Sequence, residues 1–266
     1  MRKFFVSACL AIGSLSFING ISEVKSDSTP ARNLQTLNCG TLDIPINFGF
    51  KVRREEFPSH VSLKGLPVQE RKEKFIELLL PLIERANAEV LKERAFLLSV
   101  IHKGKLSKEE EQKLEALKKK YRTDSIKELL KRVNTVPPSL VLAQAAVESG
   151  WGTSRFFTEA NNIFGMYSFH GSKCMKARGS NACLKVYDNL YQSVKDYIYN
   201  LNVGWAYEKF RDLRSKGAGV NALLEALGKY SELEGKYVEL VRSVIKKNNL
   251  ERFDESEFAS AGRGGR

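Results

Sequence analysis

One acidic residue of this 266-residue chain lies in an otherwise apolar, small-residue stretch, where it would suit acid catalysis. The stretch Pro137–Gly152 begins with two prolines, which fit the first turn of a helix, and ends in glycines, which commonly terminate helices. Apolar residues recur between them with helical spacing. Glu148 is therefore predicted in the last turn of a largely buried helix, where burial and the helix dipole both raise the pKa of a carboxyl group. A glycosidase needs such a protonated acid near neutral pH.

The residues that follow Glu148 could line a sugar-binding cleft. Trp151 lies between Gly150 and Gly152. Glycine lets a backbone or a flat sugar come close, and an exposed aromatic ring can stack on a sugar face. Asn161–Gly165 forms a second turn, whose amide side chains could tie loops together or line the cleft. The competing interpretation is that Glu148 is a solvated surface residue near a helix end.

The stretch AQAAVESGWGTSRF, followed by NNIFGMY, resembles the signature of the glucosaminidase family, which is glycoside hydrolase family 73 of the lysozyme-like superfamily. The pattern is similar to the Bax-type subgroup, and FIELLLPLIERANAEVLKER extends the resemblance to roughly residues 70–253. The resemblance implies a mainly α (α+β) fold, with a lysozyme-like helical domain, a small β-hairpin lobe and a cleft between them. It also implies hydrolysis of β-1,4 bonds in peptidoglycan with Glu148 as the general acid.

The same resemblance implies further site residues. Tyr230 corresponds to a tyrosine that lies in the cleft of related enzymes and matters for catalysis, and its phenol could orient a water or stabilise charge at the sugar. The alternative for Tyr230 is packing at a helix junction. The predicted substrate-binding residues are Trp151, Asn162, Phe164, Tyr167, Glu232 and Tyr237.

The expected hairpin lacks an acidic residue. We predict its strands at Met166–Phe169 and Leu184–Tyr187. Several relatives carry a second catalytic acid there, but no Asp or Glu occurs between Gly165 and Tyr187, so a two-carboxylate scheme does not transfer. Asp188 is the first acid afterwards, and we predict that it caps the next helix. Lys185 is a weaker candidate for contact with substrate.

The sequence contains four cysteines, and two of them are placed to pair if the protein enters an oxidising compartment. Cys174 and Cys183 flank the hairpin tip and are predicted to form a disulfide. Cys9 would leave with a signal peptide, and Cys39 is then free unless the connectivity differs. Metal binding by these cysteines has little support, because the nearest histidine is His170 and no second ligand pair follows. Neither a metal nor an organic cofactor is implied.

The N-terminus is typical of an exported protein. Arg2 and Lys3 precede the apolar run Phe4–Ile18, which is too short for a confident membrane span. We predict a signal peptide at residues 1–22 and export to the periplasm or cell envelope, or secretion; an uncleaved N-terminal anchor is the minor alternative.

The net charge is +12, with lysines spread along amphipathic helices and no nucleic-acid motif. The acidic cell wall or a membrane surface is therefore the expected partner, the competing interpretation is that the charge only keeps the surface soluble, and the expected state is a monomer.

Four further segments follow the signal peptide in the predicted organisation. Residues 23–66 form an extended arm with a short strand at Leu42–Phe50, residues 67–122 form helices that pack on the catalytic domain, residues 123–253 form that domain, and residues 254–266 form a disordered basic tail.

Individual helices are also predicted from apolar spacing and capping residues. A long helix runs from Pro67 to about His102, and Ser107 with Glu110 forms a capping box for a charged helix over Lys108–Tyr121. A short helix begins at Thr123 or Asp124 and ends near Val133, and another runs over Tyr191–Leu201. The aromatic residues around Trp205, Tyr207 and Phe210 are expected to be mostly core.

The predicted activity is that of an endo-β-N-acetylglucosaminidase. The second half of the reaction is left open: a water could attack with inversion, or the 2-acetamido oxygen of the substrate could assist. One alternative is a lytic transglycosylase on a related fold, and another is a wall-binding protein with weak or lost activity. No Cys/His pair or zinc cluster supports an amidase.

Overall fold

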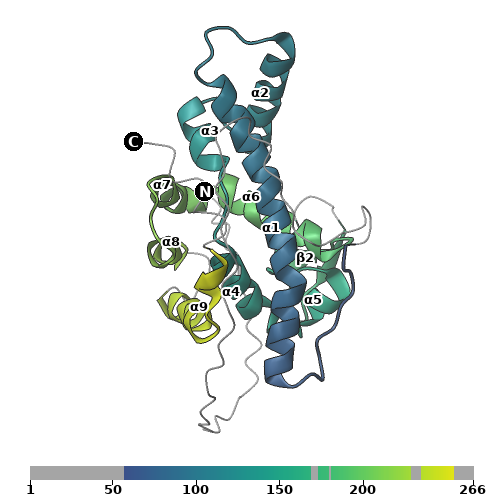
Figure 1. The fold of residues 1–266 in the computed structure, drawn as a ribbon. Helices are drawn as coiled ribbons and strands as arrows, with labels where there is room; N and C mark the ends of the chain where they lie inside the picture. The colour runs from purple at the N-terminus through teal and green to yellow at the C-terminus, as the bar shows by residue number, and fades with distance from the viewer. Residues whose placement is uncertain (1–56, 169–172, 180, 229–234, 255–266) are drawn as a thin grey trace, which may run out of the picture. The chain divides into compact units, whose positions relative to one another are not determined.

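Helices make up most of the chain in the computed structural model, which describes residues 57–168, 173–179, 181–228 and 235–254 (Figure 1). One two-stranded antiparallel sheet accompanies them in these ranges, which confirms the mainly α fold with a small hairpin. The helices are α1 (Val68–Val100), α2 (Lys108–Tyr121), α3 (Ile126–Arg132), α4 (Pro138–Ser149), α5 (Arg155–Ala160), α6 (Leu190–Val203), α7 (Glu208–Ser215), α8 (Val220–Ala226) and α9 (Gly235–Lys247), with the 3-10 turns η1 (Trp205–Tyr207) and η3 (Leu250–Phe253). The strands are β1 (Cys174–Lys176) and β2 (Cys183–Lys185).

Helix α1 is the long helix predicted from three-and-four apolar spacing. It starts directly after Pro67 and ends two residues before the predicted His102. Its buried face packs against α4 and α6. Pro81 lies inside the helix, as expected, and Asn87 lies fully buried on its apolar stripe. The helix therefore brings a polar side chain into the core, where it must find partners.

Helices α2 and α3 follow their capping residues. The capping box of Ser107 and Glu110 is present, and α2 has the predicted bounds. The predicted start of α3 at Thr123 or Asp124 is too early: Ser125 is the N-cap, because its hydroxyl accepts from the backbone N–H of Glu128 at 3.3 Å. All three residues are chemically suited to the position, so the choice depends on backbone geometry.

Buried and half-buried polar side chains hold the end of α3 and the segment between α3 and α4. Arg94 donates to the carbonyls of Leu130 and Val133, each at 2.7 Å, and Arg214 donates to two further carbonyls of the same stretch. Asn87 pairs with Val136 in both directions, at 2.8 and 3.1 Å. Carbonyls at a helix C-terminus have no partner within their own helix, so these side chains satisfy groups that would otherwise be buried unpaired.

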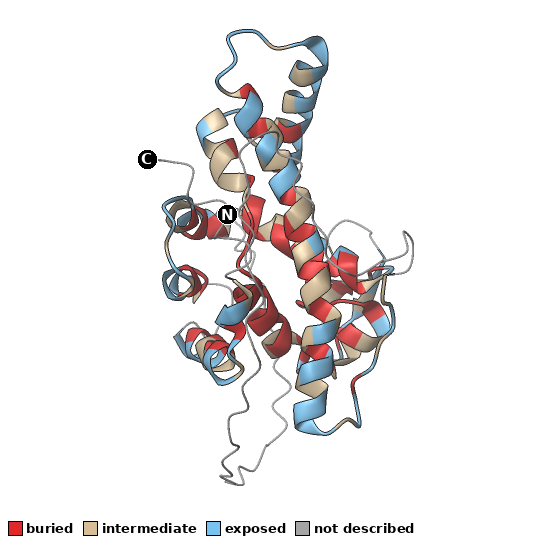
Figure 2. Ribbon diagram, in the orientation of Figure 1, coloured by how far each residue is buried: buried red, intermediate tan, exposed pale blue. Residues whose placement is uncertain are grey.

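Helix α4 is the most buried helix, with Pro138–Ala146 and Ser149 in the core (Figure 2). It contacts α1, α8, α9 and η3. Its N-cap, Pro137, has no capping side chain. Asp254 fills that role from the far end of the chain: its carboxylate accepts from the backbone N–H of Ser139 at 2.8 Å and from its hydroxyl at 2.6 Å. The prediction that Asp254 belongs to a disordered tail is therefore wrong. Its carboxylate lies at the N-terminus of α4, where the helix dipole favours negative charge.

The described end of the predicted N-terminal arm packs on the helices. Phe57 stacks on Tyr191 with ring centroids 4.3 Å apart, and the carbonyl of Pro58 accepts from the N–H of Leu190 at 2.9 Å. Leu63 is buried in the core. Residues 57–66 thus belong to the folded unit and not to the arm. The predicted signal peptide, the Leu42–Phe50 strand, Cys39 and the residues beyond Asp254 lie outside the described residues.

The hairpin differs from its predicted bounds. Strand β1 pairs with β2 in the register Cys174↔Lys185, Met175↔Leu184 and Lys176↔Cys183. The segment predicted as the first strand, Met166–Phe169, lies along the other edge of β2, where Tyr167 and Leu184 form a single bridge. Strand β2 thus has a neighbour on each edge. The paired strand is β1, which the disulfide also joins to β2, and the segment predicted as a strand makes only the single bridge.

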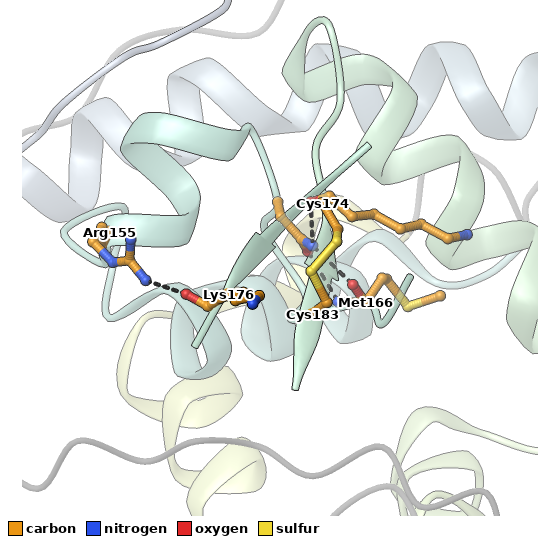
Figure 3. Close-up of a disulfide and its surroundings, with 7 residues drawn as sticks. Arg155, Met166, Cys174, Lys176 and Cys183 are labelled. Carbon is orange, nitrogen blue, oxygen red and sulfur yellow. Dashed lines mark hydrogen bonds between the residues drawn. A yellow bond between two sulfur atoms is a disulfide. The ribbon is translucent and has the colours of Figure 1, made fainter. Parts of the chain in front are cut away.

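The predicted disulfide joins Cys174 to Cys183 across this ladder, with Cα atoms 5.5 Å apart (Figure 3). Arg155 of α5 donates to the carbonyl of Lys176 at 2.7 Å, and the N–H of Lys185 donates to the carbonyl of Met166 at 2.9 Å. The hairpin is therefore tied to α5 and to the segment that precedes it. Among the described helices, none is both long and apolar enough to span a bilayer.

The capping role of Asp254 can be tested by its removal. Asp254→Ala is expected to lower the free energy of unfolding by about 1–2 kcal/mol, the usual effect of losing a helix N-cap. Urea denaturation followed by circular dichroism measures this change. Glu251→Ala, an exposed carboxylate on the same 3-10 turn, is the matched control. Equal effects of the two substitutions would contradict the capping role.

Candidate active site

Glu148 lies in the last turn of α4, as predicted, and the chain reverses direction directly after it. Gly150 takes a left-handed conformation (φ 58°, ψ 46°), and its N–H donates to the carbonyl of Ala146. Trp151 and Gly152 also have positive φ angles, of 57° and 77°. A positive φ is uncommon for a bulky residue, and such strain is often held at functional sites. The turn sets both the end of α4 and the direction in which Trp151 leaves it.

The carboxyl group of Glu148 is enclosed, although the residue as a whole is partly exposed. Its Oε1 atom is buried and has no hydrogen-bond partner among the residues that the structure describes. Burial raises the pKa of Glu148 to about 7, and a hydrogen bond from Tyr237 opposes this rise. An unpaired buried oxygen on a group with a shifted pKa marks a candidate functional site. A carboxyl group with this pKa is partly protonated at neutral pH.

Within the described ranges, three buried tyrosines from three elements interact electrostatically with Glu148: Tyr197 of α6, Tyr207 of η1 and Tyr237 of α9. Burial is the main reason that each phenol has a raised pKa, and the charge of Glu148 adds to it. For Tyr207 the pKa is raised to about 12. All three phenols are thus neutral at physiological pH, so Glu148 has neutral polar neighbours. A cation at this place would instead keep the pKa of the acid low.

Gln144 connects two of these phenols. It lies one turn before Glu148 on α4 and is fully buried. The hydroxyl of Tyr197 donates to Gln144 Oε1, and Gln144 Nε2 donates to the hydroxyl oxygen of Tyr237 at 2.8 Å. Tyr237 in turn hydrogen-bonds with Glu148. The buried polar groups behind the acid therefore form one connected set.

Trp151 stays a candidate for contact with a sugar. Its ring packs edge-on against Phe75 of α1, with centroids 5.4 Å apart, and Lys72 Nζ lies 5.3 Å from the ring centroid. The side chain is only partly buried. An aromatic ring held by packing near an acid provides a rigid surface for stacking, so the prediction of a substrate-binding role is retained.

Three predicted substrate-binding residues are instead buried in the core. Asn162 is 1% exposed, and its amide group pairs with the backbone of Met166 and with the carbonyl of Lys185, which pins the hairpin to α5. Phe164 is fully buried and stacks on Tyr197 at 3.9 Å. Tyr237 is 1% exposed and interacts with Glu148 inside the core. Burial of these side chains leaves them no surface for a glycan, so the structure argues against their predicted contact with substrate.

The remaining predicted site residues have different outcomes. Tyr167 is half-buried at its bridge to Leu184, and its contact with substrate stays a prediction. Tyr230 and Glu232 lie outside the described residues. The weaker candidate Lys185 is paired with Asp196 at 2.6 Å.

The predicted capping role of Asp188 is wrong. Asn189 is the N-cap of α6, because its side-chain oxygen accepts from the N–H of Gln192 at 3.0 Å. Asp188 is exposed and exchanges hydrogen bonds with Gln192. In the described part of the chain, no three or more His, Cys, Asp or Glu side chains gather as they would around a metal ion.

The sequence interpretation missed Gln144 and Tyr197 and read Tyr207 only as core. One signal was available for Gln144: it is a polar residue in an apolar helix, placed four residues before Glu148 and therefore on the same face. Nothing local distinguishes Tyr197 or Tyr207 from packing aromatics. Most of the aromatic residues in this group were expected to be core: Tyr207 and Phe210 are buried, whereas Trp205 is 69% exposed.

Comparison with known proteins gives a consistent result. The glucosaminidase family, described as mannosyl-glycoprotein endo-beta-N-acetylglucosaminidase, matches residues 102–250. The chain is 35% identical over 178 residues to Protein bax of Escherichia coli (strain K12), which covers 62% of this chain and 63% of that protein. It is 24% identical over 132 residues to Exo-glucosaminidase LytG of Bacillus subtilis (strain 168), which covers 45% of this chain and 47% of that protein.

One solved structure also matches. The catalytic domain of the autolysin Auto from Listeria monocytogenes covers 71% of this chain and 89% of its own, with 19% identity and a TM-score of 0.44. The chain thus spans less than two thirds of the length of either Protein bax or LytG.

The shifted pKa of Glu148 predicts a pH-dependent cost to stability. The folded protein binds the proton up to about pH 7, whereas an unfolded chain releases it near 4.5, so the free energy of unfolding falls as pH rises through this window. Glu148→Gln is therefore expected to be more stable than the wild type at pH 8, by up to about 3 kcal/mol, and similar to it near pH 4. Urea denaturation at both pH values measures the difference. The exposed Glu239→Gln is the control, and an effect of Glu148→Gln that does not change with pH would refute the shift.

Proposed function

Because this chain belongs to the glucosaminidase family, we propose that it is a glycoside hydrolase that cuts β-1,4 bonds of peptidoglycan glycan strands next to N-acetylglucosamine. Glu148 is the general acid. The observation that carries this proposal is the buried Oε1 of Glu148, which has no partner among the described residues and belongs to a carboxyl group with a pKa of about 7. A carboxyl group with this pKa is suited to hold a proton for a leaving oxygen.

The first step follows from this acid. Glu148 donates its proton to the departing glycosidic oxygen while an oxocarbenium-like centre forms on the sugar. General acid catalysis accelerates a reaction by about 10²–10⁴-fold, so binding and distortion of the sugar supply the rest. Trp151 supports the sugar by stacking at the end of α4, beside the exposed backbone of Gly150.

The second step does not depend on a carboxylate of the described hairpin, because β1, β2 and their flanks contain no Asp or Glu. Two routes fit one acid. A water held by backbone groups or by Tyr230 attacks with inversion, or the 2-acetamido oxygen of the substrate attacks intramolecularly. The second route requires N-acetylglucosamine on the side of the bond that becomes the new reducing end.

The same single acid also supports a second candidate reaction. A lytic transglycosylase uses one acid and adds no water, so its products carry an anhydro end. The chemistry of the products separates these two activities from each other and from wall binding without cleavage.

Export to the cell envelope completes the proposal. The disulfide between Cys174 and Cys183 supports an oxidising compartment, where such bonds persist. The apolar N-terminal segment of the sequence and its net charge of +12 support export and attraction to an acidic wall polymer.

A digest of purified peptidoglycan tests the reaction directly. The products are reduced with borohydride and identified by mass spectrometry. We expect reduced N-acetylglucosamine ends from the wild type and a loss of about 10²–10⁴-fold in rate for Glu148→Gln, with Glu159→Gln as an exposed control near the same turn. Anhydro ends would assign a transglycosylase, and released peptides with intact glycan would assign an amidase. If the protein sediments with the wall but releases no products, it binds the wall without cleaving it.

The pH dependence of the rate gives a second test. A general acid works only while protonated, so the rate is expected to fall as pH rises through about 7, the pKa of Glu148. The rate of clearing of a peptidoglycan suspension between pH 5 and pH 9 measures this limb. A rate that keeps increasing up to pH 9 would exclude Glu148 as the acid.

A further inference from the structure

We propose that Lys72 of α1 is a specificity-determining residue, whose ammonium group binds a carboxylate of the glycan strand that stacks on Trp151. In peptidoglycan this carboxylate belongs to a muramic acid residue, either on its lactyl group or on the peptide joined to that group. The inference rests on the proposed function, because it adds a charged contact to the same site.

Lys72 and Trp151 come from distant parts of the chain and meet beside the turn that follows Glu148. Lys72 lies near the start of α1, and its Nζ atom is 5.3 Å from the centroid of the Trp151 ring. Phe75, one turn further along the same helix, packs edge-on against that ring with centroids 5.4 Å apart. Helix α1 therefore both holds the ring in place and puts a cation over it.

Lys72 has no acidic neighbour on its own helix. The residues that a helix brings next to position 72 are three and four positions away, and they are Val68, Gln69, Phe75 and Ile76. Among the residues that the structure describes, no carboxylate forms an ion pair with Lys72. Its side chain is half-buried against the ring. The positive charge is therefore available to an anion from outside the protein.

The next lysine of α1 shows the contrast. Lys74 pairs with Glu77, three residues further along, at 2.9 Å, and both side chains are more than half exposed. Glu73, the acid directly after Lys72, accepts a hydrogen bond from Gln69 at 2.8 Å. These two acids thus have partners other than Lys72.

The contact between Lys72 and the ring can be exchanged for a stronger one. A cation over an aromatic ring is held only weakly where water reaches it. A hydrogen bond between an ammonium group and a carboxylate is charge-assisted and stronger, and lysine carries its charge on a long, flexible stem. When a sugar stacks on Trp151, the Nζ atom of Lys72 can therefore move from the ring to a carboxylate beside that sugar.

The chemistry of the strand decides which sugar supplies the carboxylate. N-acetylglucosamine is neutral, whereas muramic acid bears a lactyl carboxylate that is either free or joined to a peptide with carboxylates of its own. A β-1,4 polymer of N-acetylglucosamine offers similar rings for stacking but no anion. Trp151 is therefore expected to accept both kinds of strand, and Lys72 to favour strands that contain muramic acid.

Three variants isolate the charge of residue 72. Lys72→Gln removes the charge and keeps most of the length of the side chain, and Lys72→Arg keeps the charge. Lys74→Gln, at the exposed lysine paired with Glu77, is the matched control. Each substitution is made in the full chain together with Glu148→Gln, so that the glycan is not consumed, and thermal unfolding verifies that each variant is folded.

Titration calorimetry at about 0.15 M salt, which screens distant charges, measures the binding of three soluble probes. The probes are glycan strands freed of peptide by an amidase, uncrosslinked strands that keep their peptides, and oligomers of N-acetylglucosamine of similar length. The first two are the strands that contain muramic acid.

Lys72→Gln is expected to weaken binding of the strands that contain muramic acid by about three- to tenfold, the effect of one charged hydrogen bond that stays partly exposed. Its affinity for the neutral oligomers is expected to be unchanged. Lys72→Arg is expected to keep most of the affinity, and Lys74→Gln all of it. A loss confined to peptide-free strands assigns the carboxylate to the lactyl group, and a loss confined to peptide-bearing strands assigns it to the peptide.

The outcomes separate this inference from the proposed function. Equal losses for neutral strands and strands with muramic acid, no loss for either, or no binding of any probe while Lys72 is intact would overturn the role of Lys72, whatever the activity. A selective loss, in a protein whose wild type cleaves no peptidoglycan, would support the role of Lys72 and overturn the proposed cleavage. A selective loss together with cleavage by the wild type would support both.

Discussion

The burial of α4 is the constraint on which the rest of the structure depends. A helix that is apolar on all sides cannot end in water, so both of its ends need polar partners supplied by the fold. At the N-terminal end these are Asp254, which bonds Ser139, and Asn87, which holds the backbone of Val136. At the C-terminal end the left-handed Gly150 closes the helix. Residues from the first and last described helical segments thus meet at α4.

The same burial gives Glu148 its chemistry. Removal of water from a carboxyl group disfavours its charged form, and the neutral phenols around it supply no cation that would reverse this effect. The fold separates its charges accordingly. Half-buried Arg94 and buried Arg214 donate to carbonyls at and just beyond the C-terminal end of α3, where the helix dipole favours cations. These two positive charges thus lie at one end of the α3–α4 segment, and the acid lies at the other.

The hairpin shows how local and tertiary information divide. The spacing of Cys174 and Cys183 around a turn was sufficient to predict their disulfide, because the pairing is local. The strand bounds were not predictable, because β2 offers two edges and the sequence contains similar partners for each. Asn162 presents the same difficulty. From the sequence, its amide group could either line a cleft or hold a loop in place. Its hydrogen bonds to Met166 and Lys185 show that it holds the loop.

The sequence alone determined the helices, because apolar spacing and capping residues act within one or two turns: α1, the capping box of α2, and α4 with Glu148 in its last turn all lie where the pattern predicts. The tertiary structure decided what surrounds that acid. Tyr197 and Tyr237 reach it from helices 49 and 89 residues further along the chain, and Asp254 reaches the other end of α4 from still further away. Contacts of this kind depend on how helices pack, and no local pattern encodes them.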